Sequence, residues 1–210
     1  SLSFFFYAIA HLNLGSAMTL NYTSPIFLGF FLPFISHQKI KKSIFICTIV
    51  GFTGALLILD PHGEWQSWFA GLVGLVSGIG AALAYIHVIQ LSKLNEPDWR
   101  IVFYFTLVSS IGSGLWLSFT DYQKLVWNDI WILIPLGLSA TIAQIAMTRA
   151  YRLGNSIVIG TLSYLAIVFS GIISLLYFNE TMRIEDVLGA LMIIISGAIA
   201  SNISLKSRIN

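Results

Sequence analysis

The sequence is dominated by apolar runs of about twenty residues, which short polar connections separate. A helix needs about 20 mostly apolar residues to cross the hydrocarbon core of a bilayer. The runs are continuous and lack the period-two alternation of membrane β-strands, so they predict helices. The first run is too short to cross, which leaves about seven full transmembrane helices and a partial one. The expected segments, with edges uncertain by a few residues, are 1–10, 15–35, 43–59, 71–91, 101–119, 130–148, 156–178 and 184–204.

The composition excludes an ordinary water-soluble domain. Of the 210 residues, 57% are hydrophobic and only 10% are charged, whereas soluble domains carry roughly 25% charged residues. The polar connections are too short to form domains of their own. The sequence therefore predicts an all-α integral membrane protein, a helical bundle surrounded by the lipid bilayer.

Lys and Arg residues are distributed unequally when alternate connections are assigned to opposite sides of the membrane. The positive-inside rule makes the side with more of them cytoplasmic, which places the C-terminus in the cytoplasm. A nucleic-acid partner is not expected, because no basic face with interleaved aromatic residues is visible. The cytoplasmic side holds Lys39, Lys41, Lys42, Lys93, Arg100, Arg149, Arg152, Lys206 and Arg208, and the other side holds Lys124 and Arg183.

A weak internal repeat is the most informative feature of the sequence. Residues 20–27 match residues 162–169 at an offset of 142. Each copy contains a helix, a short break, a helix with an internal Tyr, a polar corner and a Gly-containing helix. The charge distribution gives the two copies opposite orientations, and inverted repeats are a signature of secondary transporters. The alternative is that two apolar helices resemble one another by chance.

The offset also predicts how the chain is divided. The second copy begins near Gly71, so its partner would begin about 70 residues before Ser1. We expect residues 1–70 to be the remainder of the first repeat, namely the end of helix 3 with helices 4 and 5. Residues 71–210 would form the second repeat, helices 6 to 10, in a protein of two inverted five-helix repeats.

Beside the repeat, several short motifs match the pattern of a known transporter family. They are residues 21–27, 149–156, 162–169 and 179–180, with Gly51, Gly54 and the pair Asp60-Pro61. By these motifs the chain resembles the EamA family of the drug/metabolite transporter superfamily. One departure is Gln38, where the family usually has Glu at the end of the fourth helix. The resemblance implies export or uptake of small polar metabolites, such as amino acids or related compounds, by alternating access in a bacterial inner membrane. A homo-oligomer is left open.

Polar side chains inside the apolar segments are the candidate substrate-binding residues, because burying them is costly unless they are paired or line a cavity. Asn21 and Tyr22 lie inside the segment 15–35, and Ser163 and Tyr164 occupy the matching place in the second copy. A central cavity between the copies would bring these groups together. Gln144 is a further candidate for the cavity wall. The alternative for each residue is a hydrogen bond between neighbouring helices.

Three basic or titratable residues are weaker candidates for the cavity or its mouth. Arg149 and Arg152 could attract anionic substrates at the inner mouth, although the sequence favours the alternative that they anchor the helix by the positive-inside rule. His87 could contact substrate or a proton, but it lies near the end of its segment, where water can satisfy it.

Two local patterns predict how the helices pack and bend. Gly74 and Gly78 form a G-x-x-x-G motif, which is typical of close helix packing in membranes. Pro25 and Pro33 each remove a backbone hydrogen bond inside one apolar segment. Such interruptions can mark a moving or binding segment of a transporter, or they can be simple kinks.

No motif for ATP hydrolysis, metal binding or cofactor binding is present in the sequence. There is no G-x-x-x-x-G-K-[ST] loop, Cys47 is the single cysteine, and the four His residues lack ligand spacing. We therefore expect a secondary transporter with no metal and no cofactor, and not an enzyme. Two alternatives remain: an intramembrane enzyme acting on lipid, which would need acid/base pairs, and a scaffold subunit without transport activity.

Overall fold

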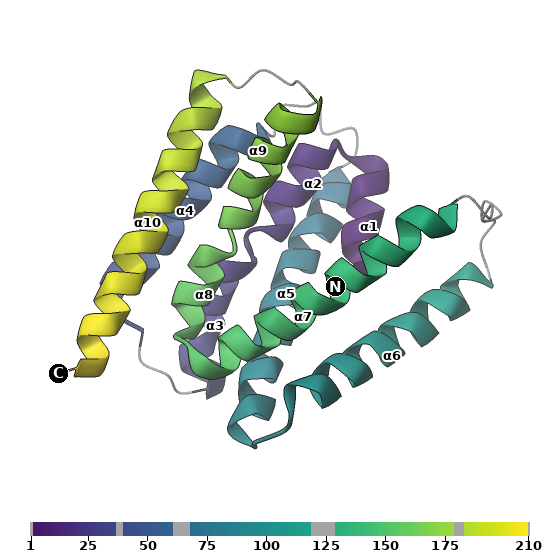
Figure 1. Ribbon diagram of the computed structural model, residues 1–210, viewed down its shortest axis with the longest axis horizontal. Coiled ribbons are helices and arrows are strands. Elements are labelled where there is room, and N and C mark those ends of the chain that lie inside the picture. The colour runs from purple at the N-terminus through teal and green to yellow at the C-terminus, as the bar shows by residue number, and fades with distance from the viewer. Residues whose placement is uncertain (1, 37–39, 61–67, 119–128, 179–182, 210) are drawn as a thin grey trace. The chain divides into compact units, whose positions relative to one another are not determined.

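The computed structural model describes residues 2–36, 40–60, 68–118, 129–178 and 183–209. These residues form α-helices joined by turns, with no strand among them (Figure 1). The all-α fold expected from the sequence is therefore confirmed for the described part of the chain. The helices are α1 (Leu2–His11), α2 (Leu14–Asn21), α3 (Ser24–Ser36), α4 (Lys42–Leu59), α5 (Trp68–Lys93), α6 (Asp98–Leu117), α7 (Ile130–Leu153), α8 (Ser156–Leu162), α9 (Leu165–Phe178) and α10 (Ile184–Ile209).

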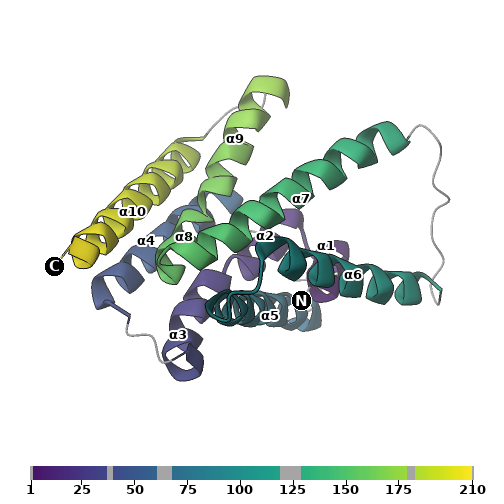
Figure 2. The ribbon, with the colours of Figure 1, turned by 60° about the horizontal axis from the view of Figure 1, so that its bottom comes forward.

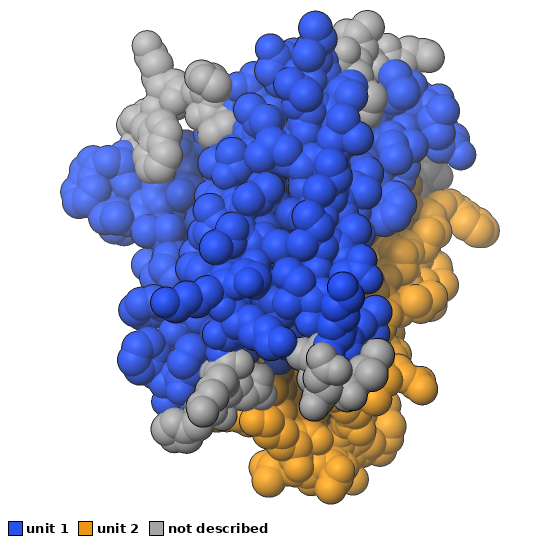
Figure 3. Space-filling view, turned by 90° about the vertical axis from the view of Figure 1, so that its left-hand side faces the viewer, with its two compact units in different colours: residues 1–86, 155–210 blue, residues 87–154 orange. Residues whose placement is uncertain are grey.

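The helices fall into two compact units, which are described separately. Unit 1 comprises residues 1–86 and 155–210, and unit 2 comprises residues 87–154 (Figure 3). Helix α5 begins in unit 1 and ends in unit 2. Unit 1 therefore contains helices from both predicted repeats, whereas unit 2 contains only α6, α7 and the end of α5.

Six segments within the described residues are long and apolar enough to cross a membrane. The sequence predicted about seven full crossings, and the seventh corresponds to α6. This helix has 20 residues, but Asp98, Arg100 and several hydroxyl side chains make it more polar than the others. The six are Leu14–Ile35, Lys42–Leu59, Trp68–Lys93, Ile130–Leu153, Ser156–Tyr177 and Ile184–Lys206.

Two of these crossings are each made of two helices with a break between them. Helices α2 and α3 share one crossing, and α8 and α9 share another. At the first break, the Thr23 hydroxyl donates to the Leu20 carbonyl at 2.5 Å, which satisfies a carbonyl at the end of α2. The sequence predicted a continuous segment with a Pro-induced interruption at Pro25. The chain in fact breaks before that residue, and Pro25 lies in the first turn of α3, where a missing N–H costs little.

The core of unit 1 is built on the antiparallel pair α4 and α10, which lie side by side in both ribbon views (Figures 1 and 2). A β-carbon placed on Gly54 would lie 2.6 Å from the carbonyl oxygen of Gly189. One placed on Gly189 would lie 2.5 Å from the carbonyl oxygen of Gly54. Only glycine at both positions allows this backbone approach, as is usual where small residues let helices pack in membranes.

The predicted G-x-x-x-G motif packs α5 against the first break. A β-carbon on Gly78 would lie 2.5 Å from the Thr23 hydroxyl and 2.6 Å from the Leu20 carbonyl. A β-carbon on Gly74 would lie 2.7 Å from the Leu20 side chain. The close helix packing expected from this motif is therefore confirmed, and its partner is the α2–α3 break.

Unit 2 is held together where the end of α7 meets the turn before α6. The Nε atom of Arg152 lies 2.8 Å from a carboxylate oxygen of Asp98, and its Nη2 donates to the Glu96 backbone carbonyl. Arg100 pairs with the Glu96 side chain at 2.8 Å. The two Arg152 contacts connect the two long helices of the unit at one end.

Candidate functional site

Unit 1 contains an open cavity of about 670 Å³ between helices that come from both predicted repeats. This volume lies within the usual range of small-molecule sites, roughly 300–1,000 Å³. The wall is mostly apolar, with hydroxyl groups from Tyr22, Ser170 and Ser174 and charged groups from the beginning of α10. The lining residues are Met18, Tyr22, Ile58, Leu59, Ala166, Ile167, Val168, Ser170, Gly171, Ser174, Leu175, Arg183, Asp186 and Ala190.

The two tyrosines singled out in the sequence lie together, one in the wall of the cavity and one behind it. The ring centres of Tyr22 and Tyr164 are 6.0 Å apart with an interplanar angle of 53°. Tyr22 is half-buried and lines the cavity, whereas Tyr164 is fully buried. The Tyr164 ring also packs against Phe52, with the two ring centres 6.3 Å apart. Tyr164 therefore supports the cavity wall and does not form part of its lining.

The Tyr164 hydroxyl has no hydrogen-bond partner among the described residues. An unsatisfied buried polar group costs about 1–3 kcal/mol. The surrounding packing against Ala55, Ile167 and Ile193 offsets this cost, since all of them belong to the buried core of the unit. The aromatic ring, more than the hydroxyl, is therefore what this position contributes.

Asn21 and Ser163 make hydrogen bonds at the two breaks. The Asn21 side-chain amide donates to the hydroxyl of Ser77 in α5 at 3.2 Å. The Ser163 hydroxyl donates to the Gly160 carbonyl at 2.7 Å. Neither residue is among those lining the cavity, and the Asn21 contact is the interhelical hydrogen bond that the sequence left open as an alternative.

The other four candidate residues belong to unit 2. His87 is exposed, and its Nδ1 lies 3.1 Å from the Gln90 side-chain oxygen. Gln144 is half-buried, Arg149 is exposed, and Arg152 is engaged by Asp98 and the Glu96 carbonyl. The structure thus places the Arg152 guanidinium between the Asp98 carboxylate and the Glu96 carbonyl of its own unit.

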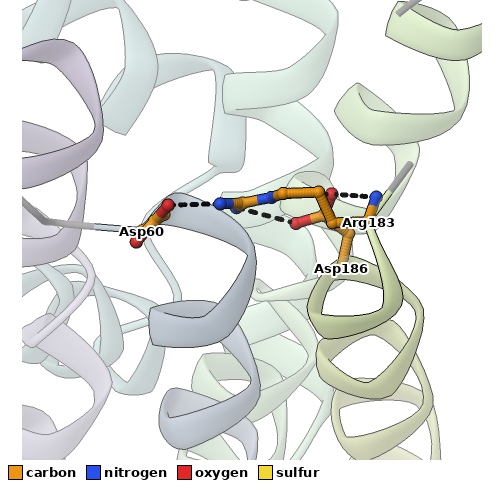
Figure 4. Close-up of polar contacts among 3 residues, drawn as sticks. All are labelled: Asp60, Arg183 and Asp186. Atoms are coloured by element: carbon orange, nitrogen blue, oxygen red, sulfur yellow. Dashed lines mark hydrogen bonds and ion pairs between the residues drawn. The ribbon is translucent and has the colours of Figure 1, made fainter. Parts of the chain in front are cut away.

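A charged cluster at the beginning of α10 was not singled out from the sequence as part of a site. Arg183 pairs with Asp186 at 3.1 Å and with Asp60 at the end of α4 (Figure 4). These carboxylates, Asp186 first and Asp60 second, raise the pKa of the Arg183 guanidinium above its ordinary value. Sequence reasoning used Arg183 only as a charge on one side of the membrane, and the motif Asp60-Pro61 was the one signal that pointed to this corner. Gln38, Pro61 and Glu180 lie outside the described residues.

Comparison with known proteins identifies the family. The sequence profile of the EamA-like transporter family matches residues 1–60 and 68–202. The chain belongs to the EamA-like transporter family. The resemblance found in the sequence motifs is thereby confirmed, and membrane transport is the activity of this family.

Several relatives of this EamA-like chain carry functional names. The pseudopaline exporter of Pseudomonas aeruginosa is 27% identical over an alignment of 201 residues, which covers 91% of this chain and 67% of the exporter. A riboflavin transporter of Brucella anthropi is 24% identical over 192 residues, covering 90% of this chain and 67% of the relative. Human solute carrier family 35 member G1 is 24% identical over 204 residues, covering 91% of this chain and 56% of the human protein. The chain spans about two thirds of the length of the bacterial relatives and less of the human one.

A crystal structure of another protein supports the EamA-like fold. It aligns with a TM-score of 0.85 over 97% of this chain and 72% of its own, at 17% sequence identity. At this identity the likeness concerns the fold alone.

Proposed function

We propose that this EamA-like chain carries a small polar metabolite across the membrane through the unit 1 cavity, by alternating access and without ATP hydrolysis. The observation that carries the proposal is the cavity itself, which opens between α2 and α4 on one side and α9 and α10 on the other. A cavity at this place favours a carrier over a scaffold, whose helices would pack without such a space. The names of the pseudopaline exporter and the riboflavin transporters support transport of small organic molecules.

Equivalent helix starts support the division into inverted repeats 1–70 and 71–210. Helices α2 and α8 begin at Leu14 and Ser156, which differ by the repeat offset of 142. Each is preceded by an Asn that caps it: the Asn13 side chain accepts from Ser16 at 2.7 Å, and Asn155 accepts from Ile157 at 3.1 Å. Helices α4 and α10 begin at positions 42 and 184, again 142 apart.

Contacts between the copies support a local two-fold axis. A β-carbon on Gly51 would lie 2.9 Å from Ser196, and one on Gly54 would lie 3.1 Å from Ile193. Under the offset of 142, Gly51 corresponds to Ile193 and Gly54 to Ser196, so the two contacts are equivalent by the repeat. Tyr22 and Tyr164 are equivalent under the same offset and contact one another, so the proposed axis passes between them. Transporters with inverted repeats bind substrate near such an axis, where broken helices meet.

We assign roles to the candidate residues from this geometry. Tyr22 contacts the solute, because it lines the cavity and offers an aromatic face and a hydroxyl. Tyr164 holds the Tyr22 ring in place, and Asn21 fixes the first break to α5 through Ser77. Ser163 keeps the second break in its turn.

The roles of unit 2 in this proposal remain predictions from the sequence. These predictions are Gln144 as a cavity residue and His87, Arg149 and Arg152 as residues of the cavity or its mouth. The C-terminus would be cytoplasmic and the membrane a bacterial inner membrane. A homo-oligomer and the substrate class of amino acids or related compounds stay predictions as well.

The test is solute flux in proteoliposomes that contain no ATP. We expect the protein to exchange a labelled metabolite from a panel of amino acids, riboflavin and pseudopaline, and Tyr22→Ala to lower the rate by at least tenfold. Tyr177→Ala is the matched control, because Tyr177 is 79% exposed in α9 and does not line the cavity. No flux across the panel, or equal loss in both variants, would contradict the proposal.

A further inference from the structure

Asp60 occupies a backbone position that disfavours it in two ways. It caps the C-terminal end of α4 with φ 41° and ψ 69°, in the left-handed region that favours glycine. Its carboxylate also lies at the negative end of the helix dipole, where basic residues are preferred. Such local violations persist where the surrounding structure compensates them, and they concentrate at functional sites.

The compensation at Asp60 comes from the N-terminal end of α10. Arg183 contacts Asp60 through Nη1 and Asp186 through Nη2 (Figure 4). The Arg183 backbone N–H also donates to Asp186 at 2.8 Å. The Arg183–Asp186 pair therefore belongs to one helix end, whereas the Arg183–Asp60 pair is the one that joins α10 to α4.

The junction lies at the cavity. Arg183 and Asp186 line it, as does Leu59, the last residue of α4 before Asp60. We propose that the Asp60–Arg183 ion pair is a latch that controls access of solutes to the cavity from the end at which α4 ends and α10 begins. The proposal rests on the proposed transport function, since a carrier must close its cavity toward each side in turn.

The exposure of this latch suits repeated opening. The Arg183 and Asp60 side chains are 48% and 35% exposed, so water can solvate both charges when they separate. Exposed ion pairs are weak, whereas a buried pair would be held much more strongly. Arg183 keeps its contact with Asp186 when Asp60 moves away, so the guanidinium retains a carboxylate partner in the open state.

Thiol accessibility in membrane vesicles tests the latch. The reporter is Ser174→Cys in the cavity wall, in a protein whose single cysteine is replaced by Cys47→Ser. Its labelling rate is measured with a cationic and an anionic methanethiosulfonate reagent. Asp60→Asn breaks the latch and should fold normally, because Asn adopts the left-handed region as readily as Asp. Asp186→Asn is the matched control, since it removes the same charge and leaves the Asp60–Arg183 pair in place.

We expect Asp60→Asn to raise the labelling rate with both reagents about two- to fivefold over Asp186→Asn, the effect of losing one exposed ion pair. Arg183→Gln should also raise both rates. If only the loss of a negative charge mattered, labelling by the cationic reagent would slow and labelling by the anionic reagent would speed up, equally in Asp60→Asn and Asp186→Asn. That result, or unchanged rates in Asp60→Asn, would overturn the latch. The assay measures no flux, so a protein that transports nothing can still show the latch, and a transporter can still lack it.

Discussion

The close contact of α4 and α10 makes Gly54→Ala the sharpest test of the packing. The new β-carbon would lie 2.6 Å from the Gly189 carbonyl oxygen, 3.0 Å from Met192 Cβ and 3.1 Å from Ile193 Cγ1. The nearest atom is backbone, which cannot rotate away, so the two helices must separate by a few tenths of an ångström. Overpacking of this kind costs about 1–3 kcal/mol.

The matched control for this variant is Gly112→Ala in α6, where a β-carbon would meet nothing within 4 Å. Both changes gain the same helix propensity, about 1 kcal/mol. The difference between the two variants therefore isolates the packing cost. We expect Gly54→Ala to be less stable than Gly112→Ala by about 1–3 kcal/mol.

The assay is reversible unfolding of the purified protein in mixed detergent micelles, followed by circular dichroism. The free energy of unfolding of Gly54→Ala should fall below that of Gly112→Ala with an unchanged denaturant dependence. Equal stability of the two variants would refute the close approach of α4 to α10.

Two further predictions concern buried hydroxyl groups in unit 1. Thr48→Val removes the buried 2.7 Å hydrogen bond between the Thr48 and Thr161 hydroxyls. The free energy of unfolding in micelles should therefore fall by about 0.6–1.7 kcal/mol. If a double variant with Thr161→Val loses the sum of both single effects, the two hydroxyls are not directly coupled. Tyr164→Phe removes a hydroxyl without a partner among the described residues, so stability should stay equal or rise by up to about 1–3 kcal/mol; a marked loss would show that this hydroxyl is hydrogen-bonded.

The ends of the apolar segments were well predicted, because the length of each apolar run can be counted directly from the sequence. The segment expected at 43–59 is α4, Lys42–Leu59, and the one expected at 184–204 starts, as α10 does, at Ile184. The breaks were harder to place, because a turn such as the one at Thr23 depends on a hydrogen bond from its own side chain and on Gly78 packing against it. A hydropathy pattern shows neither the side-chain hydrogen bond nor the glycine packing.

The sequence predicted only that part of the candidate site which the internal repeat indicates. The offset paired Tyr22 with Tyr164, and the structure places the two rings in contact. It could not distinguish the lining residue from the one behind it, because that depends on which helix face turns inward. The Asp60–Arg183 pair joins residues 123 positions apart. Because Asp60 and Arg183 are not equivalent under the offset, the repeat gave no reason to pair them.

Alternating access requires that the cavity beside Tyr22 opens in turn to the two sides of the membrane. The most direct measurement is labelling of Tyr22→Cys, with Cys47→Ser, by an impermeant thiol reagent added to right-side-out or to inside-out vesicles. We predict that the thiol reacts from either side, and that fixing the protein in one state by crosslinking α4 to α10 at the latch abolishes labelling from the latch side alone. Labelling from one side only in the uncrosslinked protein would contradict alternating access.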